Sequence, residues 1–216
     1  MAEIIHIILI FFGIGLIYED DNIYFTILFT LFVGISMNWS ANTVGHIHLH
    51  NPIFRANFIN VSFDKIISIS NSYPQSIWKF RHLQHHAGSK HKIPFLTASA
   101  LYLELALILF SWTTIALLST RVLLAFVAGS ALGLFICWVQ GKYEHYSDGR
   151  VVQEGISHYG RVYNTIFFND GFHIEHHRYA TRHWTELPSV RVQARRESSL
   201  PPQLRWAERG QKWRVA

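Results

Sequence analysis

The chain has 216 residues, of which 50% are hydrophobic and 15% are charged, and Lys and Arg outnumber Asp and Glu by 19 to 14. The apolar content excludes a disordered chain, and the one cysteine excludes a disulfide framework, a cysteine-ligated iron–sulfur cluster and a CxxC redox motif. A net charge of +5 is compatible with nucleic-acid binding, but the long apolar segments favour a membrane surface. Composition alone does not explain the 14 histidines.

Four apolar segments have the composition of membrane helices. They are Ile4–Tyr18, Ile23–Ser40, Pro94–Leu118 and Val122–Val139. A helix that crosses a bilayer needs about 20 apolar residues, with a range of about 17–25, and the last three segments meet this length. The first segment is shorter, but it has neither the basic start nor the small-residue cleavage site of a signal peptide. We therefore expect it to form a short membrane helix.

The connections and the positive charges predict the topology. Residues 19–22 join the first two segments and residues 119–121 join the last two, so we expect two helical hairpins. Of the 19 Lys and Arg residues, only Arg121 lies in these connectors, whereas the others lie in residues 51–93 or after Val139. Basic residues remain cytoplasmic. The N-terminus, the middle segment and the C-terminal end are therefore predicted on the cytoplasmic side.

The sequence thus predicts an all-α integral membrane protein with four transmembrane helices in two hairpins and a histidine-rich helical cap on the cytoplasmic side. The middle segment, residues 51–93, has an apolar side and is expected either to lie in the membrane interface or to form an ordinary helix packed on the histidine region. We expect residues 1–188 to form the membrane domain with its di-metal cap. Residues 189–216 are polar and Arg-rich, and are expected to form a solvated basic tail.

Histidines follow the second and the fourth apolar segments. The first cluster is His46-Ile-His48-Leu-His50, in which a turn of about 100° per residue puts His46 and His50 on one helix face and His48 nearly opposite. His145 occupies the corresponding position after the fourth segment. We take His46, His50 and His145 as metal ligands and His48 as a residue with another role.

Two further clusters share the spacing HxxHH. They comprise His82, His85 and His86, and His173, His176 and His177. Positions i, i+3 and i+4 fall on one helix face, and three buried imidazoles there are costly unless something binds them. Together with His46, His50 and His145, these six make nine candidate ligands. Nine are too many for one metal ion, whereas two ions with four or five nitrogens each account for all of them. Imidazole ligands suit Fe, Zn, Cu or Ni.

The three clusters resemble the histidine boxes of the membrane-bound di-iron fatty acid desaturase and hydroxylase superfamily, in order, spacing and topology, over about residues 41–188. The segment Phe172–Tyr179 is similar to the third box of the desaturases. Lys142–Tyr146 resembles the extra histidine motif of the alkane hydroxylases, and Trp184–Pro188 resembles the carotenoid ketolases. The proline that commonly follows the third box is Ala180 here.

The resemblance implies two iron ions (Fe2+/Fe3+) and an O2-dependent attack on an unactivated C–H bond of a lipid or other long alkyl chain that arrives from the bilayer. Desaturation is the expected outcome, with hydroxylation or ketone formation on a fatty acid, alkane or carotenoid as the alternative. The sequence holds no haem or iron–sulfur module, so electrons are expected from a separate ferredoxin, rubredoxin or cytochrome b5 type of protein. A membrane metal transporter is the non-enzyme alternative, but a transporter places its ligands near mid-membrane. No nucleic acid is expected.

Several polar residues near the boxes are further candidates. Glu144, Asp170 and Glu175 are expected either to orient imidazoles through the ring nitrogen that does not bind metal or to be solvated acids. Asn164 and Asn169 are candidates to place a water near one iron.

Glu104 lies inside the third apolar segment, where an acid is expected either to be functional or to extend toward the interface. The histidines without a partner at ligand spacing are His6, His91, His158 and His183. We expect these four at a surface or interface.

Overall fold

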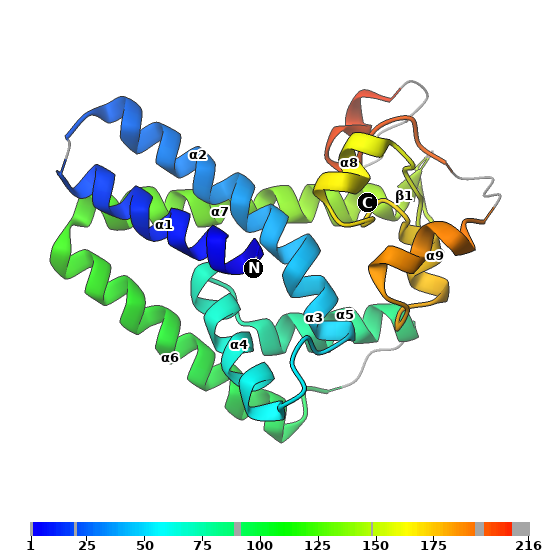
Figure 1. Ribbon diagram of the computed structural model, residues 1–216, viewed down its shortest axis with the longest axis horizontal. Coiled ribbons are helices and arrows are strands. Elements are labelled where there is room, and N and C mark those ends of the chain that lie inside the picture. Colours follow the sequence, from blue (N-terminus) through cyan, green and yellow to red (C-terminus); the bar gives the residue numbers. More distant parts are fainter. Residues whose placement is uncertain (1, 20, 89–91, 148, 193–196, 209–216) are drawn as a thin grey trace. The chain divides into compact units, whose positions relative to one another are not determined.

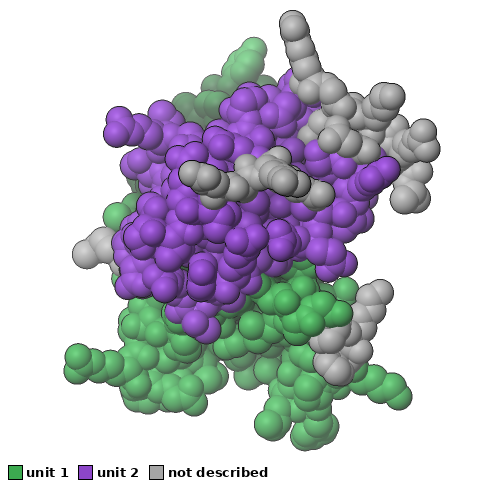
Figure 2. Space-filling model, turned by 90° about the vertical axis from the view of Figure 1, so that its right-hand side faces the viewer, with its two compact units in different colours: residues 1–134 green, residues 135–216 purple. Residues whose placement is uncertain are grey.

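Figure 1 shows the computed structural model of the chain, in which residues 2–19, 21–88, 92–147, 149–192 and 197–208 are described. The chain divides into two compact units, residues 1–134 and residues 135–216, which Figure 2 distinguishes by colour. His91 and the parts 193–196 and 209–216 of the predicted tail lie outside the described residues.

Four long helices carry the predicted apolar segments, and each is long and apolar enough to cross a membrane. They are α1 (Ala2–Glu19), α2 (Ile23–Ser40), α6 (Phe95–Leu118) and α7 (Thr120–Glu144). The first three lie within residues 1–134, and α7 continues from there into the second unit. A helix satisfies its backbone hydrogen bonds internally, as a hydrocarbon environment demands. The prediction of an all-α fold with four membrane helices is confirmed.

Helix α2 does not end where the apolar segment ends. A π-helical turn, Ala41–Gly45, and the short helix α3 (His46–His50) continue the same run, so that one candidate span of 28 residues results. At the junction the backbone N–H of His46 bonds the carbonyl of Ala41, five residues earlier. The first histidine cluster, predicted just beyond the membrane helix, therefore lies on the continuation of that helix.

The membrane helices of the first unit bury one face and expose the other. Their buried side chains form a core cluster of Ile10, Ile17, Phe29, Val33, Val122, Ala125 and Phe126. On the outer faces, large apolar side chains such as Phe12, Tyr24 and Leu117 are exposed. Long helices with apolar outer faces suit a surrounding of lipid hydrocarbon.

Helices α2 and α7 approach closely because glycine lies between them. A Cβ atom at Gly129 of α7 would lie 2.7 Å from the carbonyl oxygen of Thr30 and 2.7 Å from Cβ of Val33, both on α2. A Cβ atom at Gly133 would lie 2.7 Å from Sδ of Met37. Since lipid tails are as apolar as the side chains, membrane helices gain association energy from such close backbone packing. The contact between α2 and α7 thus requires glycine here.

Two helices fill the middle segment, α4 (Asn57–Ser70) and α5 (Gln75–Ala87), and both pack against α6. Helix α4 buries Ile67 but leaves Phe58 exposed, so it has an apolar outer side as well as a packed one. Helix α5 ends at Gly88, whose φ of 60° is a left-handed conformation that glycine adopts at little cost. The segment between the two hairpins is therefore structured, and α5 carries the second histidine cluster.

A buried carboxylate joins α4, α5 and α6. Glu104 of α6 is completely buried and accepts hydrogen bonds from Lys65 Nζ at 2.6 Å, Ser76 N at 3.0 Å and Ser76 Oγ at 2.6 Å. Ser76 lies in the first turn of α5, where backbone N–H groups have no partner within the helix. Glu104 therefore does not extend toward the interface: it holds the start of α5 in place.

The second unit contains the last part of α7 and the short elements that follow it. They are strands β1 (Tyr146–Ser147) and β2 (Arg150–Val151), helices α8 (Arg161–Ile166) and α9 (His173–Arg178), and the 3-10 helices Trp184–Val190 and Pro202–Ala207. The two strands pair antiparallel. The described part of the predicted tail packs within this unit, because Ser198 N donates to Ser157 O at 3.0 Å and Arg205 is buried. The predicted division at residue 188 remains a prediction.

Two of the histidines expected at a surface or interface are buried. His6 is 4% exposed, and its Nδ1 lies 3.1 Å from Oε1 of Glu3, whose carboxylate also accepts from Ser40 Oγ. His158 is 7% exposed, and its Nδ1 lies 3.3 Å from the carbonyl oxygen of Ser198. The expectation of a surface position was wrong for both. Ser40 reaches the Glu3 carboxylate beside His6 from another helix, and Ser198 lies 40 residues from His158, so local spacing did not indicate the burial.

Replacing Gly129 by Ala tests the close contact of α2 and α7. The added methyl group has no room, so we expect Gly129→Ala to destabilise the protein by about 1–3 kcal/mol, as overpacked cores do. The measurement is the thermal unfolding midpoint in detergent, followed by circular dichroism. Gly15→Ala is the matched control, since nothing lies within 4 Å of a Cβ atom there. Alanine favours a helix over glycine by about 1 kcal/mol, so this variant should hold or raise the midpoint.

Replacing Glu104 by Gln tests the carboxylate that holds α5. Because Lys65 would keep its charge in a largely buried place, we expect a loss of roughly 3–5 kcal/mol in Glu104→Gln, seen as a lower unfolding midpoint. The double variant Lys65→Met/Glu104→Gln removes the unpaired charge and should recover part of this loss. Glu154→Gln breaks an exposed pair with Arg178 and should change the midpoint little. Equal midpoints for Glu104→Gln and wild type would contradict the assigned role.

Candidate metal centre

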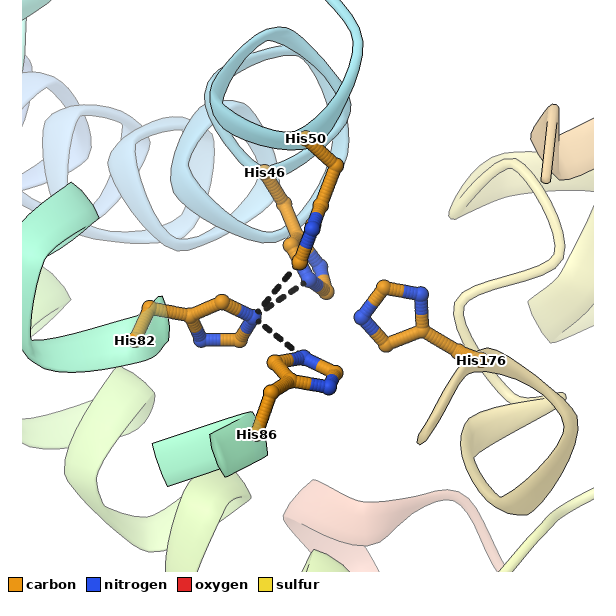
Figure 3. Close-up of side chains that lie close together, drawn as sticks. All are labelled: His46, His50, His82, His86 and His176. Carbon is orange, nitrogen blue, oxygen red and sulfur yellow. Dashed lines mark hydrogen bonds between the residues drawn. The ribbon is translucent and has the colours of Figure 1, made fainter. Parts of the chain in front are cut away.

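Four imidazoles of the first unit point their Nε2 atoms toward one place. His46 and His50 come from α3, and His82 and His86 come from α5. His82 Nε2 lies 3.0 Å from Nε2 of His46, 3.0 Å from Nε2 of His50 and 2.9 Å from Nε2 of His86. Figure 3 shows the four rings pointing toward one another. We call these four residues the α3–α5 histidine group. Each pair is spaced i and i+4 on its helix, so two helix faces supply the four nitrogens.

Hydrogen bonding alone does not account for this arrangement. A neutral imidazole nitrogen carries either one hydrogen or one lone pair, so Nε2 of His82 cannot be joined to three other Nε2 atoms by three good hydrogen bonds. If a metal cation lay among the nitrogens, each of the four Nε2 atoms could coordinate it through its lone pair. With metal–nitrogen distances of about 2.0–2.1 Å, neighbouring ligands at right angles lie about 3 Å apart. The observed spacing therefore fits a metal ion bound by several imidazoles.

The charge state of this group also fits metal binding. Burial lowers the pKa of His82 well below its usual range, and positive charge on His46, His86 and His50 would lower it further. The imidazole of His82 is therefore neutral at physiological pH. Neutral imidazole is the form that binds metals.

Two histidines of the first two clusters lie apart from this group. The ring of His85 is exposed, and its centroid lies 6.1 Å from His82 and 5.9 Å from His86. The ring of His48 is buried, with Nε2 3.4 Å from Asn60 O and 3.4 Å from Asp64 Oδ1. His48 thus points away from the group, as the helix geometry of the sequence predicts.

A second group of imidazoles forms within the second unit, from His145, His173 and His177. Their ring centroids lie 4.7–4.8 Å apart, and Nε2 of His173 lies 2.9 Å from Nε2 of His145. His145 Nδ1 lies 2.9 Å from the carbonyl oxygen of Val152, which only accepts, so Nδ1 carries the hydrogen and Nε2 keeps its lone pair. His176 is turned aside, with ring centroids 6.3 Å from His173 and 6.1 Å from His177.

Two of the predicted orienting acids form a buried network next to this second group. Gln140 Nε2 donates to Glu144 Oε1 at 2.9 Å and to Asp170 Oδ2 at 2.9 Å, and Tyr163 OH donates to Asp170 Oδ2 at 2.8 Å. Burial, and then the charges of Asp170 and Glu144, raise the pKa of Tyr163 well above its usual range, so it stays a donor. Glu144 Oε2 lies 3.9 Å from His173 Nε2. The acids are therefore tied to each other more closely than to an imidazole.

The third predicted orienting acid, Glu175, faces away from the imidazoles. It is completely buried, and it accepts hydrogen bonds from Ser157 Oγ at 2.8 Å, Tyr159 OH at 2.7 Å and Val192 N at 2.9 Å. Ser157 Oγ in turn accepts from the Ile174 N–H of α9 at 2.9 Å. Burial, together with the hydrogen bond to Glu175, raises the pKa of Tyr159 to about 12. Glu175 thus holds α9 in place rather than orienting a ring.

The remaining candidates have structural contacts. Asn164 Nδ2 donates to the His158 carbonyl at 2.8 Å, and Asn169 Nδ2 donates to the Trp184 carbonyl at 3.1 Å. His183 is exposed, as expected. Sequence reasoning did not find Ser157 or Tyr159, because neither stands at a recognisable spacing from the carboxylate it contacts.

Comparison with known proteins identifies the family. The fatty acid desaturase family model matches residues 88–207, which is more than half of the chain. The match contains His145, His173, His176 and His177, whereas the first two clusters precede it. No curated protein and no solved structure matches the chain. With its membrane helices and histidine groups, the chain therefore belongs to the fatty acid desaturase family and, with it, to the membrane-bound desaturase and hydroxylase superfamily of oxidoreductases.

Proposed function

We propose that the protein is a membrane-bound non-haem di-iron fatty acid desaturase, which uses O2 to introduce a double bond into a fatty acyl or similar long alkyl chain. The convergence of four Nε2 atoms within the α3–α5 histidine group carries this proposal, because three good hydrogen bonds cannot account for it and a metal ion among the nitrogens would. Family membership supports iron and lipid as the metal and the substrate class.

We propose all nine predicted histidines as the ligands of two iron ions. They are His46, His50, His82, His85, His86, His145, His173, His176 and His177. The α3–α5 histidine group and the group of the second unit support seven of the nine by their close approach, and His85 and His176 are included for their place in the two HxxHH clusters. Bound iron would supply the redox chemistry that activates O2 against an unactivated C–H bond.

The residues around the ligands would keep the nitrogens where the metal needs them. Glu104 fixes the first turn of α5, so that the helix with His82 and His86 starts from a defined point. Glu175 and Ser157 do the same for α9. Such positioning matters because the outcome of C–H attack depends on substrate placement to about an ångström.

The charge distribution supports the proposed orientation and partners. Apart from Arg121, every Lys and Arg lies in the middle segment or beyond Val139, which favours the cytoplasmic side for the N-terminus, the histidine boxes and the C-terminal end. We propose residues 1–188 as the membrane domain with its cap and residues 189–216 as a basic tail. A separate electron donor of ferredoxin, rubredoxin or cytochrome b5 type would supply the electrons.

One observation favours hydroxylation as the second candidate reaction. His145, in the segment Lys142–Tyr146 that resembles the extra motif of the alkane hydroxylases, joins His173 and His177 in the second histidine group. A ligand at this place supports the hydroxylase branch as much as the third box supports the desaturases. Desaturation and hydroxylation are distinguished by their products, a double bond or a hydroxyl group.

Iron content tests the ligand assignment. We expect His82→Ala to lower the iron bound per folded chain, because His82 Nε2 is the atom nearest to three other nitrogens of its group. The measurement is iron by inductively coupled plasma mass spectrometry on monodisperse protein expressed with iron. His48→Ala is the matched control from the same boxes, and it should keep its iron. Unchanged iron in His82→Ala, or full zinc occupancy without activity after iron reconstitution, would remove the basis of the proposal.

The lipid profile of an expression host tests the reaction. We expect expression of the protein with a ferredoxin reductase system to produce a new double bond in host acyl chains, detected by gas chromatography–mass spectrometry. His82→Ala should abolish this product, since the ligand set would be incomplete. A new hydroxyl group in place of the double bond would assign the protein to the hydroxylase branch. No change in any lipid, with O2 consumption absent as well, would contradict both reactions.

A further inference from the structure

An apolar cavity of about 550 Å³ lies among α1, α4, α6 and α7 in the first unit. Its inner wall includes Ile10 and Phe126, which are 5% and 4% exposed, and its outer wall includes Phe11 and Phe110, which are 67% and 70% exposed. The cavity therefore extends from the core of the helices to the face on which they expose apolar side chains. That face is the one that lipid hydrocarbon would cover.

The polar atoms of the cavity wall already have partners. The wall has no charged side chain, and its three hydroxyl groups belong to Ser70, Ser111 and Thr114. Ser111 Oγ donates to the Leu107 carbonyl at 2.9 Å and Thr114 Oγ1 to the Phe110 carbonyl at 2.9 Å. Ser70 Oγ lies 3.2 Å from the Ile67 carbonyl oxygen. No group of the wall needs a hydrogen bond from an occupant, so hydrocarbon fits the cavity better than water or a polar ligand.

The length of the cavity matches one leaflet of a bilayer. Its wall includes Phe110 and Leu118 of α6, and a helix rises 1.5 Å per residue, which gives about 12 Å between them. The hydrocarbon core of a bilayer is about 30 Å thick, so one leaflet supplies about 15 Å of acyl chain. A volume of about 550 Å³ also lies within the range of sites that hold a small molecule.

We propose that this cavity binds one acyl chain of a bilayer phospholipid, which stays with the protein as part of its membrane domain. None of the histidines of the α3–α5 group or of the second group lines the cavity. The site is therefore separate from the proposed metal centre, and its occupant is a resident lipid rather than the chain that reacts. The lipid would fill space that would otherwise separate α1 from α6.

Retention of lipid by the purified full-length protein tests this site. Dioleoyl phosphatidylcholine is added to delipidated protein in detergent, and the bound lipid is counted by native mass spectrometry. We expect wild type to retain a single phospholipid and Ser111→Trp to lose most of it, because the indole would occupy the cavity. Thr113→Trp is the matched control, since Thr113 donates to its own helix in the same way but is exposed and does not line the cavity.

Further arms make the result decisive. Thr114→Trp is a second cavity variant for the case that Ser111→Trp does not fold, and the unfolding midpoint of each variant shows which protein is intact. His82→Ala, which removes a proposed metal ligand outside the cavity, should keep its phospholipid. A failure of the metal-site proposal can thus be distinguished from a failure of the lipid-site proposal. Equal lipid retention by wild type and both cavity variants would overturn the inference. Binding of added oleic acid in place of phosphatidylcholine would also overturn it.

Discussion

The α3–α5 histidine group sets the constraint on which the first unit depends. One Nε2 atom lies 2.9–3.0 Å from three others, which is closer than hydrogen bonds alone account for. The backbone therefore has to hold α3 and α5 at this separation. Burial lowers the pKa of His82, so the ring at the middle of the group stays neutral and adds no positive charge to it. Two features meet this constraint. Glu104 fixes the start of α5, and the continuous helical run from α2 into α3 fixes the position of α3.

The two HxxHH clusters place their histidines in the same way. In each, the first and last histidines, spaced i and i+4, join the group of their own unit, and the histidine at i+3 is turned aside. Each cluster also lies on a helix held by a completely buried carboxylate, Glu104 for α5 and Glu175 for α9. Since a carboxylate accepts several hydrogen bonds at once, one acid ties a helix to two or more neighbouring segments. The position of each helix that carries an HxxHH cluster thus rests on a buried acid.

The length of the apolar segments was enough to predict the four long helices, and helical spacing was enough to predict which histidines share a face, because both depend on residues close in sequence. The apolar segments became α1, α2, α6 and α7 with nearly the predicted bounds, and the opposite direction of His48 followed from about 100° per residue. The roles of Glu104 and Glu175 were not predictable in this way. Lys65 lies 39 residues from Glu104, and Tyr159 lies 16 residues from Glu175. The burial of His6 was not predictable either. His6 contacts Glu3 on its own helix, and Ser40 donates to the Glu3 carboxylate from another helix.

The π-helical turn Ala41–Gly45 determines which way the first box faces. A turn that closes on the fifth residue holds one residue more than an ordinary turn, and one residue corresponds to about 100° of rotation about the helix axis. His46 and His50 follow this turn directly, so their direction relative to the lipid-facing side of α2 is set by that additional residue. The face of α2 and the face that carries His46 and His50 are therefore rotated relative to each other about the helix axis. Without the additional residue, His46 and His50 would point about 100° away from their present direction, and so away from His82 on α5.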